Sequence, residues 1–66
     1  MPQKDCITIR PGTIIGIKGE AYKVTKHYTT DRILELTRID PPHLTKTLHY
    51  RLGQSIFVRW VPDNRI

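Results

Sequence analysis

Apolar and polar residues alternate along most of this chain with a period near two. The pattern is most regular between residues 44 and 60, on either side of Gly53. The apolar positions that share one parity in each half of this segment are Leu44, Leu48, Tyr50, Leu52, Ile56, Val58 and Trp60. Because alternation with period two is typical of a strand with one buried face, the segment predicts two strands joined by a turn.

The length of the turn decides which residues of this predicted hairpin share a face. A three-residue loop over 53–55 pairs Tyr50 with Val58 and brings these apolar residues together on one face. A two-residue loop would mix apolar and basic residues on each face, so the three-residue loop is the prediction. The opposite, polar face then carries His49, Arg51, Phe57 and Arg59.

Similar alternation predicts four earlier strands, separated by turns rich in Gly and Pro. We expect these strands over residues 6–10, 13–18, 21–27 and 32–39, with a bulge or a second apolar contact in the last of them. No window has the period of a helix, and Ile, Val, Thr and Tyr are frequent. The sequence therefore predicts an all-β fold, a small antiparallel barrel of five to six strands, because closure removes exposed edges.

A chain of 66 residues predicts a single domain over 1–66, with 1–5 and 62–66 as loose ends. Such a chain buries only about 60% of its unfolded surface, so its core is small. The expected core residues are Ile9, Ile15, Ile17, Tyr22, Val24, Leu34, Leu36, Leu48, Tyr50, Ile56, Val58 and Trp60.

Charge and cysteine content narrow the classes of partner and location. Eleven Lys and Arg against six Asp and Glu give a formal charge of +5, which favours a polyanionic partner. Cys6 is the single cysteine, and no signal peptide is recognisable, so we expect a reducing, cytoplasmic setting. No apolar run approaches the roughly 20 residues of a membrane span, so no membrane partner is expected.

Metal, cofactor and catalytic chemistry find little support in the sequence. The possible ligands are Cys6, His27, His43 and His49, and none lies within four residues of another, whereas structural zinc prefers closely paired ligands. No acid is paired with a recognisable base or nucleophile. We therefore expect no enzyme, no metal and no cofactor.

Three glycines near the N-terminus could be mistaken for a phosphate-binding loop. Gly12, Gly16 and Gly19 lack the Gly-Lys-Ser/Thr ending and the helix that such a loop requires. Gly12 and Gly19 are better explained as turn residues, and Gly16 as a bulge or close-packing site.

The basic residues form two groups that are candidates for binding nucleic acid. The candidate residues are His49, Arg51, Phe57 and Arg59 on the last hairpin, and Lys18, Lys23 and Lys26 around Gly19. Arginine binds phosphate well and an aromatic ring can stack on a base, so the sequence predicts a non-enzymatic protein that binds DNA or RNA with little specificity. The alternatives are a protein-interaction module, a homo-oligomer, or a solvated face whose charges only prevent aggregation.

The segment from Pro11 to Val24, PGTIIGIKGEAYKV, resembles the opening of SH3-like small barrels. There, a strand, a glycine turn and an aromatic-x-hydrophobic strand begin the fold. Such barrels occur in the terminal DNA-binding domains of transposases and integrases, in ribosomal proteins and in chromatin readers. The chain lacks the acidic loop and aromatic ladder of peptide-binding SH3 domains, and it lacks an aromatic cage for methyl-lysine. The resemblance implies a nucleic-acid role and assigns no individual residue.

Overall fold

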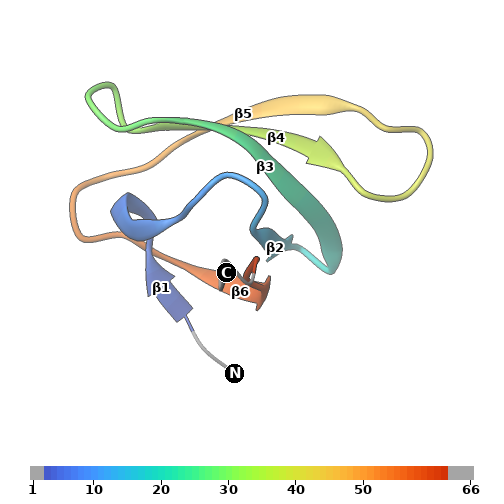
Figure 1. The fold of residues 1–66 in the computed structure, drawn as a ribbon, viewed down its shortest axis with the longest axis horizontal. Helices are drawn as coiled ribbons and strands as arrows, with labels where there is room; N and C mark the ends of the chain where they lie inside the picture. The colour runs from blue at the N-terminus through green and yellow to red at the C-terminus, as the bar shows by residue number, and fades with distance from the viewer. Residues whose placement is uncertain (1–2, 63–66) are drawn as a thin grey trace.

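The computed structural model describes residues 3–62 and contains six strands in one sheet (Figure 1). Every pair of neighbouring strands is antiparallel, and a single turn of 3₁₀ helix, η1, follows the first strand. The elements are β1 (Gln3–Asp5), η1 (Cys6–Thr8), β2 (Ile14–Ile17), β3 (Glu20–Tyr28), β4 (Ile33–Arg38), β5 (Thr45–His49) and β6 (Ser55–Trp60). The predicted all-β class and the antiparallel arrangement are confirmed.

The strands follow the order β1-β6-β2-β3-β4-β5. Strands β2 to β5 form a meander, and β6 returns to pair with β2 and β1 at the other end of the sheet. Figure 1 shows that β3 bends, so that β4 and β5 lie opposite β1 and β6. The ladders formed by residues 3–62 do not join β5 to β1, so closure into a barrel stays a prediction.

The prediction that residues 44–60 form a hairpin is wrong. Strand β5 pairs with β4, where Leu48 lies opposite Leu34, whereas β6 pairs with β2, where Val58 lies opposite Ile15. The link between them crosses from one side of the molecule to the other (Figure 1). Alternation determines which face of a strand is buried, but it does not determine which neighbour the strand takes.

The N-terminal predictions also need correction. Residues 3–5 were expected to be loose, yet they form β1, which pairs with β6. Residues 6–10 were expected to be a strand, yet Cys6–Thr8 is a helical turn because the Asp5 side chain accepts a hydrogen bond from the Ile7 N–H and caps it. Of the predicted C-terminal loose end, Pro62 is described and residues 63–66 lie outside the described residues.

The core matches the prediction at all but two positions. Its buried hydrophobic residues are Cys6, Ile9, Ile15, Tyr22, Val24, Leu34, Leu36, Tyr50 and Val58, and the partly buried ones packed against them are Ile17, Leu48 and Ile56. Cys6 is an addition, because η1 turns it inward. Trp60 was expected inside but is 54% exposed, so that prediction is wrong.

A bulge in β6 explains the exposure of Trp60. Val58 lies opposite Ile15, but Trp60, not Arg59, lies opposite Ile14, so β6 carries one extra residue at this point. An extra residue reverses the alternation that follows it, which turns Trp60 to the outer face.

The sheet has a second bulge, in β3 rather than in the predicted fourth strand, between Val24 and Lys26. It turns His27 inward, where the ring is half-buried and hydrogen-bonds to the Ile9 carbonyl through Nδ1 at 2.8 Å. A carbonyl can only accept, so Nδ1 carries the proton, and in the neutral ring Nε2 accepts from the Tyr50 hydroxyl. This network ties β3 to the segments before β2 and after β5.

We expect the free energy of unfolding to fall above about pH 9, because the fold raises the pKa of three groups that are protonated at neutral pH. Burial raises the pKa of the Cys6 thiol above its ordinary 9.0 and that of the Tyr50 hydroxyl above 10.0. The hydrogen bond to Glu20 raises the pKa of Tyr22. Since the unfolded chain loses these protons first, their contribution is complete below the unfolded pKa and is lost as pH rises towards the folded one.

Urea unfolding followed by circular dichroism from neutral to alkaline pH would measure this loss. Tyr50→Phe removes one of the groups and should flatten the alkaline part of the profile relative to wild type. A profile that stays level through about pH 11 would contradict the expectation.

Candidate nucleic-acid interface

The outer face of β2 and β6 carries an open hollow beside Gly16. It has a volume of about 550 Å³ and is lined by Gly16, Lys18, Gly19, Phe57 and Arg59. A Cβ atom on Gly16 would lie 3.1 Å from Phe57 Cδ2 and 3.3 Å from Arg59 Cδ. The absent side chain therefore lets both side chains approach β2, which confirms that Gly16 is a close-packing site.

The local sequence explains why the residues that line the hollow point outward. Val58 is buried on the inner face, so its neighbours Phe57 and Arg59 point outward. A two-residue turn, Lys18-Gly19, joins β2 to β3, and both residues have a positive φ, 51° and 82°, as in a type I′ turn. The turn holds Lys18 at the rim of the hollow, and it confirms the predicted role of Gly19.

The hollow is positively charged. Among residues 3–62, its lining includes two cations, Lys18 and Arg59, and no acid. Within residues 3–62 the ion pair of the structure joins Arg38 to Glu20, so no described carboxylate neutralises Lys18 or Arg59. These two cations are therefore available to an anionic ligand, and the Phe57 ring beside them offers an apolar surface.

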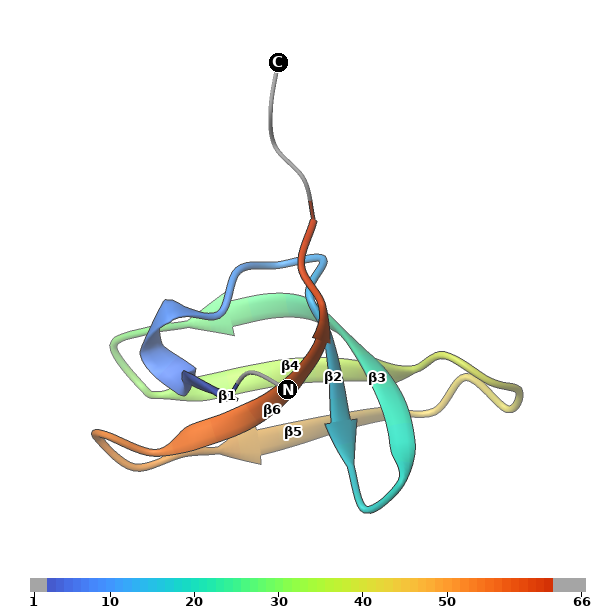
Figure 2. The ribbon, with the colours of Figure 1, turned by 90° about the horizontal axis from the view of Figure 1, so that it is seen from below.

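Two further residues, Trp60 and Lys23, lie on the same outer face of the sheet as the hollow. Strands β6, β2 and β3 lie side by side (Figure 2), and Ile14 lies between Trp60 on β6 and Lys23 on β3 in one cross-strand row. More than half of the Trp60 surface is exposed. The combined surface, here called the basic-aromatic face, consists of Lys18, Lys23, Phe57, Arg59 and Trp60.

The other predicted site residues lie elsewhere. Lys26 lies on β3 opposite Glu35, His49 ends β5 opposite Ile33, and Arg51 is exposed in the link to β6. The predicted grouping of His49 and Arg51 with the β6 residues is wrong, because it depended on a β5–β6 hairpin that does not form.

Sequence reasoning missed one member of the basic-aromatic face, Trp60. The strict alternation of residues 56–60 placed it inside, and no glycine or proline marks the bulge that turns it out. Trp60 instead lies opposite Ile14 of β2. The pairing of β6 with β2 is what brings these residues together.

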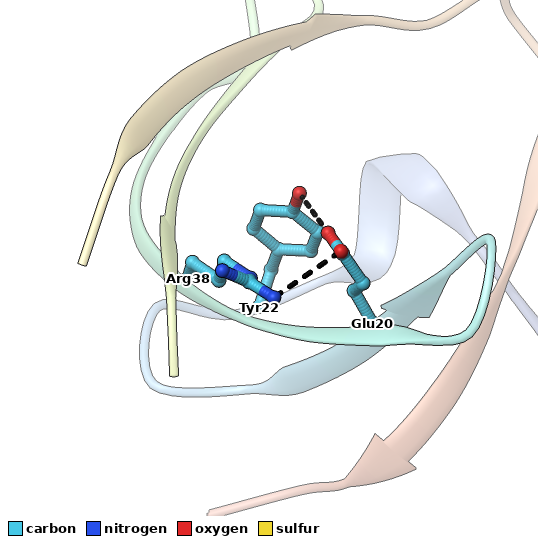
Figure 3. Close-up of polar contacts among 3 residues, drawn as sticks. All are labelled: Glu20, Tyr22 and Arg38. Atoms are coloured by element: carbon cyan, nitrogen blue, oxygen red, sulfur yellow. Dashed lines mark hydrogen bonds and ion pairs between the residues drawn. The ribbon is translucent and has the colours of Figure 1, made fainter. Parts of the chain in front are cut away.

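A second cluster, on the inner side of β3 and β4, is already internally paired (Figure 3). The Tyr22 hydroxyl donates to Glu20 Oε1 at 2.9 Å, and Arg38 Nη2 donates to Glu20 Oε2 at 3.3 Å. Lys46 Nζ lies 5.2 Å from the centre of the Tyr22 ring. Because Glu20 neutralises Arg38, the cluster stabilises the pairing of three strands and leaves little charge for a ligand.

Within residues 3–62, no group of three or more His, Cys, Asp or Glu side chains is arranged to hold a metal ion. The described part of the chain also contains no helix of the length and hydropathy needed to cross a membrane. Comparison of the chain with protein-family models, with curated proteins and with solved structures found no match.

Proposed function

We propose that this protein binds nucleic acid, without catalysis, through the hollow beside Gly16. The observation that carries the proposal is an aromatic ring, Phe57, beside two cations, Lys18 and Arg59, that pair with no acid within residues 3–62. Such cations bind phosphate, and an aromatic ring beside them can stack on a base. The net charge of +5 supports the same class of partner.

The proposed contacts favour low sequence specificity. Phosphates are identical at every nucleotide, and a ring stacks on any base, so neither contact distinguishes one base edge from another. We expect dissociation constants of about 10⁻⁴ to 10⁻⁶ M at physiological salt, the usual range of non-specific binding. Since Cys6 is a buried free thiol, we also propose a cytoplasmic location, where thiols stay reduced.

Removing the two cations of the hollow should weaken binding and reduce its dependence on salt. In the double variant Lys18→Gln/Arg59→Gln, the slope of log K against log salt should fall by about two, near one for each lost phosphate contact. Fluorescence anisotropy of labelled oligonucleotides at several salt concentrations would measure the slope. Both side chains lie on the outer face, so folding should persist.

A matched control removes the same charge away from the hollow. The variant Lys26→Gln/Arg51→Gln also lowers the formal charge by two, but neither residue lines the hollow. It should change the slope much less. Equal losses in both double variants would show that net charge alone drives binding, and an unchanged slope in the first would exclude this hollow as the phosphate site.

The free edge of β5 favours a second candidate function, a protein-interaction module or a homo-oligomer. Within the described residues β5 pairs with β4 alone, and its neighbours Leu44 and Leu52 are 61% and 77% exposed. A partner strand can add to such an edge. Binding of this kind should change little with salt, and size-exclusion chromatography would detect a second copy directly.

A further inference from the structure

We infer that the basic-aromatic face accepts single-stranded rather than double-stranded nucleic acid, with Phe57 and Trp60 as two stacking platforms. The inference rests on the proposed function and names its substrate class. It depends on the bulge in β6, which turns Trp60 onto the face that already carries Phe57.

Trp60 lies in a position that favours contact with a ligand. The ring is 54% exposed although Trp is the largest side chain available to a small core. Without the bulge, alternation from Val58 would have placed this residue inside. A large apolar ring held at a charged surface is typical of a binding site.

The spacing of the two rings suits successive bases of a single strand. Phe57 and Trp60 are three residues apart on one strand, which at a rise of about 3.3 Å per residue separates them by roughly 10 Å. This distance is large enough for each ring to take a base of its own. A ring can stack on a base only when the base is unstacked from its neighbours, as in a single strand.

Three cations lie close to the two rings in the sheet. Arg59 lies between the two aromatic residues on β6, Lys18 borders the hollow next to Phe57, and Lys23 shares the row of Trp60. The phosphates of a strand whose bases rest on β6 would therefore meet cations on the side of β2 and β3. A duplex presents its bases only as edges within its grooves, so the rings would gain no stacking from it.

The single tryptophan of the chain provides a direct readout. Titration with a single-stranded oligo-dT, with oligo-rU and with a DNA duplex of equal length would be followed by Trp60 fluorescence and by anisotropy. We expect fluorescence quenching and at least about tenfold tighter binding for the single strands, consistent with the usual strength of base stacking on one or two rings. The duplex should leave the fluorescence nearly unchanged.

Substitution of Trp60 tests whether this residue is a stacking platform. Trp60→Ala should weaken binding of oligo-dT by about 5- to 150-fold, whereas Trp60→Phe should retain most of the affinity. Tyr28→Ala is the matched control, because Tyr28 is also exposed, at 45%, but lies at the far end of β3. Far-UV circular dichroism would establish that each variant is folded.

The outcomes separate this inference from the proposed function. Equal affinity for duplex and single strand without quenching would overturn the single-strand inference and leave nucleic-acid binding intact. Equal loss in Trp60→Ala and Tyr28→Ala would overturn the assignment of Trp60. Absence of binding to all three probes at low salt would overturn the proposed function together with the inference.

Discussion

Replacing Leu36 with alanine is expected to destabilise the fold by about 2–5 kcal/mol, the usual cost of deleting a buried leucine side chain. Leu36 is fully buried in β4, with Val24 opposite it on β3 and Lys46 opposite it on β5. Rigid ladders on both sides limit how far the structure can close the cavity. A domain of this size has roughly 3–10 kcal/mol of stability in total, so the variant should be largely unfolded on warming.

Urea denaturation followed by circular dichroism would measure this loss, and Leu52→Ala is its control. Leu52 loses the same atoms but lies in the β5–β6 link with 77% of its surface exposed, so its change should stay within about 0.5 kcal/mol. Similar losses in both variants would mean that Leu36 is not part of a packed core.

The faces of the strands could be predicted because they depend on local alternation. Ile15, Leu34 and Val58 are buried where the pattern places them. The exceptions are residues at bulges or in η1, namely Trp60 and Cys6. A bulge changes the direction of every later side chain in its strand, and nothing in the local composition marks it.

Strand partners could not be predicted, because all strands of this chain carry similar alternating patterns. The pairing of β6 with β2 depends on the whole core, in which residues from both ends of the chain pack together, as Val58 and Ile15 do. A short loop at Gly53 suggested a hairpin, but the link instead bonds to the N-terminal segment, where the Cys6 N–H donates to the Gln54 carbonyl at 2.8 Å.

The candidate site could likewise be predicted within a single strand but not across strands. Phe57 and Arg59 share a face because they belong to one strand, and the sequence shows this directly. Lys18 was assigned to a separate group, and only the β6–β2 pairing unites it with them. His49 and Arg51 were added on the basis of a pairing that does not occur.

Filling the hollow with a side chain at Gly16 is expected to weaken nucleic-acid binding without changing its salt dependence. In Gly16→Val, the new Cβ would lie 3.1 Å from Phe57 Cδ2 and 3.3 Å from Arg59 Cδ, so these side chains must shift and the hollow fills. The loss should reach about 1–3 kcal/mol if Phe57 stacks on a base. The slope of log K against log salt should persist, because Lys18 and Arg59 keep their charge.

Folding should tolerate the Gly16→Val substitution, since the φ of Gly16 is not among the positive values and glycine is itself unfavourable within a strand by about 0.5–1 kcal/mol relative to alanine.

Ala21→Val is the matched control, because Ala21 lies opposite Gly16 on β3 and does not line the hollow. It adds a β-branched side chain one strand away and should leave affinity nearly unchanged. Gly16→Val and the double variant Lys18→Gln/Arg59→Gln together separate stacking from phosphate contacts. Gly16→Val should change the affinity at a constant salt slope, whereas the double variant should change the slope itself. Wild-type affinity in folded Gly16→Val would show that the ligand does not enter the hollow.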